Sequence, residues 1–192
     1  MININNQKPF KPKIADIISD LLDGEDLEIA LEFISYLTDN KINVQWTNAN
    51  TWKAVKKGVT VCYIKAGIEN KSDNPFYVKL INENDFGKGS WVINPHIPGL
   101  DGYPHVTDIK IPAGYEEIFN NKKIFNIICS KVRPCSNCGN LKKCAPGINV
   151  NFWGKKLDNR CKFFGIPFLD PDSEELECVK LLINTFRKFK NI

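Results

Sequence analysis

Four cysteines near the C-terminus have the spacing of a metal centre. The compact run Cys135-Ser-Asn-Cys138-Gly-Asn-Leu-Lys-Lys-Cys144 reads C-x2-C-x5-C, and sixteen residues separate Cys144 from Cys161. Two thiolates two residues apart can bind one ion from a tight turn, a third can return after a short loop, and a fourth can arrive from a neighbouring strand. We therefore expect a structural zinc site, because four thiolates leave no open position for a substrate.

The fourth ligand and the metal itself have alternatives. Cys161 does not belong to a second C-x2-C pair, so Cys129 is a candidate substitute, and free thiols on a polar loop remain open. Cys129, Cys135, Cys138 and Cys144 read C-x5-C-x2-C-x5-C. This run resembles the iron-sulfur loop of endonuclease III type DNA glycosylases, whose pattern is C-x6-C-x2-C-x5-C, and the resemblance implies an iron-sulfur cluster as the alternative cofactor. The helix-hairpin-helix of those enzymes has no counterpart here, so no catalytic residue is transferred.

Basic charge is concentrated on the cysteine-rich element, residues 129–163. The ten basic residues between positions 120 and 163 face one acid, Asp158, whereas the whole chain carries only +4. They are Lys122, Lys123, Lys131, Arg133, Lys142, Lys143, Lys155, Lys156, Arg160 and Lys162. With Phe152, Trp153 and Phe163 between them, they suggest contact with nucleic acid through phosphates and stacked bases. Cations that stabilise metal-bound thiolates are the alternative explanation.

A second group of residues has the chemistry of a ligand pocket. His96, Tyr103 and His105 lie with Asp101 in one segment rich in proline and glycine, which suits either a metal or acid-base site or a rigid connecting loop. The aromatic residues Trp46, Trp52 and Trp91 would border a cleft on one sheet face, or else belong to the core. Cys62 lies in a strand-like run and is expected to be a buried thiol rather than a nucleophile. No phosphate-binding loop or nucleophile elbow is present in the sequence.

Composition bounds the class of protein. The chain has 192 residues, of which 43% are hydrophobic and 25% charged, as in an ordinary folded domain. We expect one domain over residues 1–192, with no membrane segment and no secretory signal, and hence a cytoplasmic protein. In a reducing compartment clustered thiols are metal ligands more often than disulfides. Lysine outnumbers arginine, which indicates an AT-rich coding sequence and weakens arguments from lysine count alone.

Helices and strands must bring these groups together. Apolar residues recur at helical spacing from Ile14 to Leu22, with Gly24 placed to end that helix, and again from Leu27 to Leu37, with Asp26 as a cap. Further segments follow the periods of strands and helices. We expect strands at 59–64, 76–81, 91–93 and 106–111, and at 124–128 a helix by its spacing, with a strand as the alternative. A hairpin starts at 148–153 and returns at Cys161. The last helix is opened by Asp170-Pro171 and has Leu182, Ile183, Phe186 and Phe189 as its buried face.

The order of these elements predicts an α+β fold, with N-terminal helices, a central antiparallel sheet, the cysteine-rich loop and hairpin, and a C-terminal helix. The segments 46–65, 112–117 and 135–161 also resemble cytoplasmic proteins of AT-rich Gram-positive bacteria to which no activity is assigned. That resemblance implies a small α+β domain with a cysteine-rich C-terminal element. Two functions stay open: a zinc-stapled binding module for a small ligand, a protein partner or nucleic acid, and an iron-sulfur redox or nucleic-acid-processing enzyme.

Overall fold

The computed structural model describes residues 11–48, 50–68, 90–98, 107–135, 147–161 and 165–192. Its helices are α1 (Ile14–Leu21), α2 (Gly24–Asp39), α4 (Glu116–Asn120), α5 (Lys122–Lys131) and α6 (Ser173–Lys190). Its strands are β1 (Asn43–Asn48), β2 (Thr51–Lys56), β3 (Val59–Ile68), β4 (Ser90–Pro95), β5 (Asp108–Ile109), β6 (Ile148–Phe152), β7 (Lys155–Arg160) and β8 (Phe168–Leu169). The predicted α+β class is confirmed, with helices at both ends of the chain and an antiparallel sheet between them.

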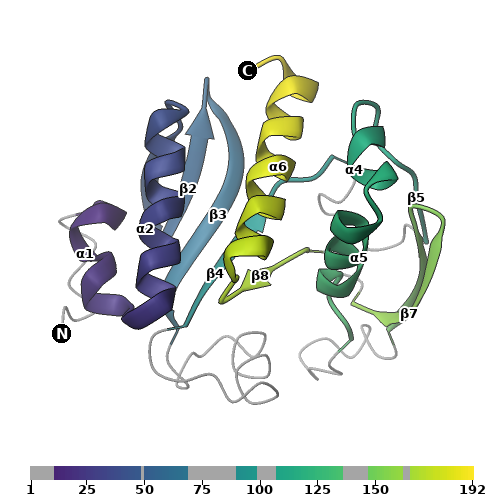
Figure 1. Ribbon diagram of the computed structural model, residues 1–192, viewed down its shortest axis with the longest axis horizontal. Helices are drawn as coiled ribbons and strands as arrows, with labels where there is room; N and C mark the ends of the chain where they lie inside the picture. Colours follow the sequence, from purple (N-terminus) through teal and green to yellow (C-terminus); the bar gives the residue numbers. More distant parts are fainter. Residues whose placement is uncertain (1–10, 49, 69–89, 99–106, 136–146, 162–164) are drawn as a thin grey trace.

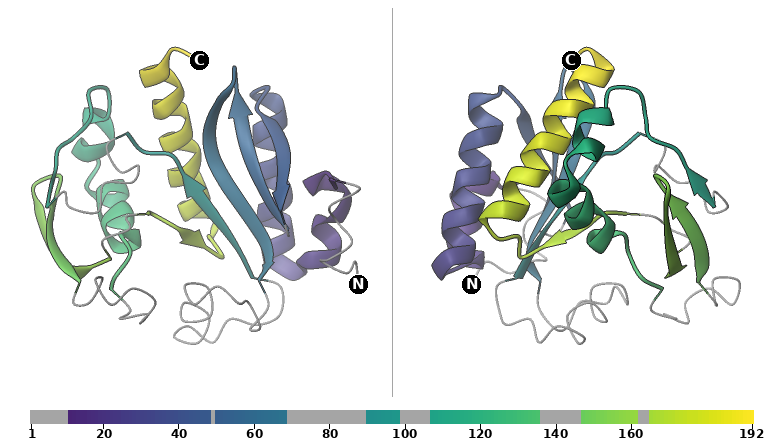
Figure 2. Two further views of the ribbon diagram at one scale, coloured as in Figure 1. Left: turned by 180° about the vertical axis from the view of Figure 1, so that it is seen from behind. Right: turned by 45° about the vertical axis from the view of Figure 1, so that its right-hand side comes forward.

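The main sheet has the strand order β1-β2-β3-β4-β8, and every pairing in it is antiparallel. Helices α1, α2 and α6 lie against one face, and the view from behind shows no described helix over the other (Figures 1 and 2). Trp52, Ala54 and Ile64 alternate with more exposed neighbours and bury their side chains beneath these helices. The expected strand at 76–81 lies outside the described residues.

The boundary between the two N-terminal helices lies two to three residues before the predicted one. Gly24 does not end the first helix, because Leu22 already closes α1 by donating its N–H to the Ile18 carbonyl at 2.9 Å. Gly24 instead opens α2 with a left-handed φ of 53°, a conformation that costs glycine little. Asp23 rather than Asp26 occupies the N-cap position of α2.

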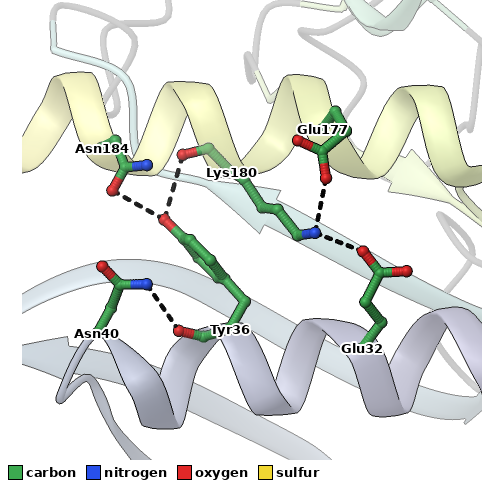
Figure 3. A network of polar contacts seen from close by, with 6 residues as sticks. All are labelled: Glu32, Tyr36, Asn40, Glu177, Lys180 and Asn184. Atoms are coloured by element: carbon green, nitrogen blue, oxygen red, sulfur yellow. Dashed lines mark hydrogen bonds and ion pairs between the residues drawn. The ribbon is translucent and has the colours of Figure 1, made fainter.

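Polar contacts join α2 to α6 on the face of the sheet that these helices cover (Figure 3). The Tyr36 hydroxyl lies 3.0 Å from Asn184 Oδ1 and 3.2 Å from the Lys180 carbonyl, either of which can accept its proton. The Lys180 ammonium donates to Glu32 at 2.5 Å and to Glu177 at 2.7 Å. These contacts fix α6 beside α2, while its apolar side, including Leu182, Ile183 and Phe186, is buried. Phe189, predicted to be buried with them, is 40% exposed.

A smaller sheet, β5-β6-β7, lies at the far side of α4 and α5 (Figure 1). The prediction that residues 106–111 add an antiparallel strand to the main sheet is wrong, since β5 pairs in parallel with β6. The predicted hairpin is present as β6 and β7. One cluster of buried residues joins the two sheets through α5, with Ile93 from the main sheet, Ile128 from α5 and Val150 from the smaller sheet. In the described part of the chain no helix is long and apolar enough to cross a membrane.

Candidate metal centre

The structure places two of the four predicted zinc ligands. Cys135 follows α5 after a short connection, and Cys161 directly follows β7. Cys138 and Cys144 lie in residues 136–146, outside the described part of the chain. The geometry of Cys135 and Cys161 is therefore what bears on the predicted site.

Cys135 and Cys161 flank one antiparallel bridge, which joins Pro134 to Arg160. The Cys135 N–H donates to the Asn159 carbonyl at 2.7 Å, and the Cys161 N–H donates to the Arg133 carbonyl at 2.9 Å. Since side chains alternate along paired strands, both cysteines point away from the face that Pro134 and Arg160 share. They are diagonal neighbours on one face. At this spacing, long side chains or a group bound by both residues can span the two strands.

The loop that carries the other two cysteines starts and ends at this bridge. Gly147 comes directly after the loop, and a Cβ at this position would collide with Cys135 Cβ and approach the Arg160 carbonyl to 2.9 Å. The backbone therefore returns from residues 136–146 in direct contact with Cys135, and Cys144 is three residues from that contact in the sequence. Gly147 was not among the predicted site residues, although a glycine between a cysteine loop and a strand is a signal for close backbone approach.

Cys129 lies in the core, on the opposite side of the paired segments 133–135 and 159–161 from Cys135 and Cys161. It belongs to α5, is 2% exposed, and has a pKa raised by burial, against which the charges of Lys155 and Arg160 act. The Arg160 side chain also donates from Nη1 to the Val132 carbonyl at 2.7 Å, next to the end of α5. Arg160 therefore faces α5 and Cys129, whereas Cys161 points away from that face, which favours Cys161 over Cys129 as a partner of Cys135.

Within the described residues, no three histidine, cysteine or carboxylate side chains gather closely enough to hold a metal ion. A tetrahedral thiolate site needs four cysteines, and the two other predicted ligands, Cys138 and Cys144, are in the loop between Cys135 and Cys161 in the sequence. No known protein family, curated protein or solved structure matches this chain.

Part of the basic charge predicted for nucleic acid is already paired with other residues of this chain. Lys123 pairs with Glu174 at 2.7 Å, and Lys131 pairs with Glu175, so both tie α5 to the first turn of α6. Arg160 donates to the Val132 carbonyl at the end of α5. Lys122 and Lys156 are exposed, and their side chains have no partner in the described part of the chain. Lys142, Lys143 and Lys162 lie outside the described residues.

The aromatic residues proposed to stack on bases are buried. Phe152 is 0% and Trp153 is 6% exposed, and the Phe119 ring meets the Trp153 ring edge-on at 3.9 Å between centroids. Trp153 Nε1 donates to the Lys110 carbonyl at 3.1 Å, which completes its burial. These two rings form the core of the smaller sheet and are not available to a base. Phe163 lies outside the described residues.

The tryptophans of the main sheet are core residues as well. Trp52 and Trp91 are 0% and 1% exposed beneath the helices, and Trp52 Nε1 donates to the Pro12 carbonyl at 2.9 Å. Trp46 is half-buried opposite Trp52 on the same face. This placement does not provide the cleft that was expected between them.

The predicted histidine site is described at one residue. His96 is half-buried between the rings of Tyr63 and Phe186, at centroid distances of 6.2 and 5.8 Å. Tyr103 and His105 lie outside the described residues, as does Asp101, so their relation to His96 stays a prediction.

Two further thiols are inert core groups. Burial raises the pKa of Cys62 far above that of an ordinary thiol and raises the pKa of Cys178 to about 12. The thiolate is the nucleophilic form of cysteine, so neither residue has the environment of a catalytic nucleophile. This agrees with the expectation that Cys62 is a buried thiol.

Proposed function

We propose that this protein is a binding module whose C-terminal element is held by a structural zinc ion bound to Cys135, Cys138, Cys144 and Cys161. The observation that carries the proposal is the bridge between Pro134 and Arg160, which puts Cys135 and Cys161 on one face. Gly147 adds support, since it brings the end of the cysteine loop back against Cys135. Binding of the metal would supply folding energy to a loop whose sequence has little apolar material.

The charge of the site is consistent with its surroundings. A zinc ion with four thiolates has a net charge of −2, and nearby cations stabilise such a group. Arg133, whose carbonyl pairs with Cys161, and the lysines of the loop would provide that positive charge. Four thiolates close the coordination sphere, so the site would stabilise structure and would not activate water.

Single serine substitutions test the ligand set. We expect Cys135→Ser and Cys161→Ser to lose most of the bound zinc and to unfold at lower temperature, because each removes a ligand. Cys129→Ser and Cys178→Ser are the matched controls, since both thiols are buried but belong to helices. Both controls should keep the zinc content of the unaltered chain. Loss of metal in Cys129→Ser with full metal in Cys161→Ser would exclude the proposed set.

The iron-sulfur alternative uses Cys129 in place of Cys161 and is tested by the same variants. Such a protein absorbs visible light and contains iron and sulfide, whereas a zinc protein is colourless. Cys129 lies in α5, on the side that Arg160 faces, whereas Cys161 points away from that side, so this alternative is the less favoured of the two. An iron-sulfur spectrum that is lost in Cys129→Ser would establish it.

For the partner of the module, we propose the phosphate backbone of a nucleic acid, recognised by charge rather than by stacking. Among the described residues between positions 120 and 163, Lys122 and Lys156 are exposed cations whose side chains have no partner. We expect Lys122→Glu/Lys156→Glu to elute from immobilised DNA at lower salt than the unaltered chain, because phosphate contacts determine the salt dependence. Lys53→Glu/Lys188→Glu changes the net charge equally, at other surfaces. Equal elution of the two double variants would contradict a local binding surface.

A further inference from the structure

A groove opens at the β1 edge of the main sheet, far from the cysteine-rich element. Its volume is about 440 Å³, within the range of small-molecule sites. Three parts of the chain line it: the start of α1, the second half of α2, and the segment that leads into β1. Its apolar lining consists mainly of Ile14, Ile34, Ile42 and Val44.

The groove exists because the helices cover the edge of the sheet incompletely. Helix α1 is anchored at its far end, where Leu21 packs so closely on Gly67 of β3 that a Cβ there would lie 2.9 Å from Leu21 Cδ2. Helix α1 stands outside α2, beside the edge of the sheet (Figures 1 and 2). Ile34 and Val44 pack against the core but remain half-buried. A ligand that covered them would remove further apolar surface from water.

The charge around the groove is positive. Lys13 and Lys41 line it, both are exposed, and neither side chain has a hydrogen bond or ion pair in the described part of the chain. No carboxylate is among the described lining residues. Lys56 donates to the Lys41 carbonyl at 3.2 Å and has a pKa lowered by desolvation and then by the neighbouring charges of Arg187 and Lys41. Cations therefore cluster at the Lys41 end, where Lys56 donates to the carbonyls of Asn40 and Lys41 just beyond the end of α2.

We propose that this groove binds an amphipathic anion, a molecule with an aliphatic chain and a terminal carboxylate. The chain would cover Ile34 and Val44, and the carboxylate would lie between the ammonium groups of Lys13 and Lys41. Charge complementarity selects this class, because an uncharged apolar ligand would leave both ammonium groups unpaired. The proposal does not depend on the zinc site or on the nucleic-acid surface.

Calorimetric titration of the 192-residue chain with decanoate, below its micelle concentration, tests the proposal. We expect saturable binding, and in Lys13→Ala/Lys41→Ala an affinity lower by about three- to tenfold, from the loss of two partly exposed ion pairs. Decanol, which has the same chain without the charge, should bind more weakly than decanoate. Its affinity should be equal for the unaltered chain and for Lys13→Ala/Lys41→Ala. Lys53→Ala/Lys188→Ala is the control, and it should bind decanoate like the unaltered chain.

A variant in the apolar lining separates groove binding from surface charge. Val44→Asp places a carboxylate where the chain would lie, and it should abolish binding while circular dichroism shows the fold unchanged. If that variant fails to fold, the lysine pair alone decides. If the 192-residue chain does not bind decanoate, the proposal is overturned. That result would mean that another part of this chain, or a second copy of it, covers the groove. Sedimentation would show the second copy as a dimer. Equal affinity of the two lysine double variants would also overturn it.

Discussion

Trp91 and Asp170 are joined by two hydrogen bonds, one of which uses a side chain in place of backbone. The Asp170 N–H donates to the Trp91 carbonyl at 2.9 Å, and the Trp91 N–H donates to Asp170 Oδ1 at 2.7 Å. This pair continues the ladder between β4 and β8 beyond its last backbone pair, Val92 with Leu169. Because the side chain accepts the second bond, the backbone of Asp170 can turn into a left-handed φ of 39° and lead toward α6.

Substitutions at Asp170 should therefore depend on the acceptor and not on the charge. We expect Asp170→Asn to keep the Trp91 contact and to change the free energy of unfolding by less than about 0.5 kcal/mol, or to raise it slightly. Asp170→Ala leaves a buried N–H unpaired and should cost about 1–3 kcal/mol. Urea unfolding of the three proteins measures the difference. Equal destabilisation by both substitutions would mean that the charge is what matters.

The pH dependence of the same pair has a defined sign. Burial raises the pKa of Asp170, and the charge of Asp26 raises it further against the hydrogen bonds from Trp91 and Ser90. The folded state therefore binds this proton more tightly than the unfolded state, and the resulting stability is present at low pH and lost as pH rises through the folded-state pKa. As the pH falls from 7 to about 4, which is near the ordinary carboxyl pKa, the unaltered chain should become more stable relative to Asp170→Asn. A constant difference across that range would contradict this.

The sequence predicts the α+β class because its periodicities are local, and it fails where a contact distant in sequence decides. Asp170-Pro171 has the residues of a helix start, yet α6 begins at Ser173, with Asp172 accepting from the Glu175 N–H at 2.8 Å. Asp170 is unavailable as a cap because Trp91, far away in the sequence, engages its carboxylate. Periodicity likewise cannot show that β5 pairs with β6 in a separate sheet, since the pattern of a strand does not name its partner.

The contact between Tyr36 and α6 should contribute more than the ion pairs beside it. Tyr36→Phe removes the hydroxyl shared by Asn184 and the Lys180 carbonyl, and we expect a loss of about 0.5–1.5 kcal/mol. Glu32→Gln breaks the bond to Lys180 at a carboxylate that is 53% exposed, so it should cost no more than about 0.5 kcal/mol. Thermal or urea unfolding compares them. A larger loss in Glu32→Gln would reverse this ranking.

Gly147 should be intolerant of any side chain. In Gly147→Ala the new Cβ would collide with Cys135 Cβ, Asn159 Oδ1 and the Arg160 carbonyl. Strand pairing holds the backbone at Cys135 and Arg160, so these two groups cannot move aside easily. We expect a loss of about 1–3 kcal/mol, as for overpacking in a core, together with weaker metal binding. Gly165→Ala is the control, because its Cβ would find only ordinary contacts at 3.9 Å. Equal stability of the two variants would argue against a tight contact between Gly147 and Cys135.

The candidate site was partly predictable for a similar reason. The cysteine spacing indicates a metal, but only pairing between residues 133–135 and 159–161 distinguishes Cys161 from Cys129. The aromatic residues Phe152 and Trp153 suggest a binding surface by type alone, whereas their burial follows from the packing of α4 and α5 on the smaller sheet. The groove lined by Lys13 and Val44 leaves no local pattern, since distant segments form it.

Elemental analysis with a visible absorption spectrum, on protein purified without air and without added metal, tests the central proposal most directly. A structural tetrathiolate site predicts about one zinc per chain, no iron and no visible absorption. Removal of that zinc by a chelator should then lower the unfolding temperature, because the metal binds the folded chain. Protein that is folded and free of metal, or that contains iron with sulfide, would contradict the proposal that zinc holds the C-terminal element.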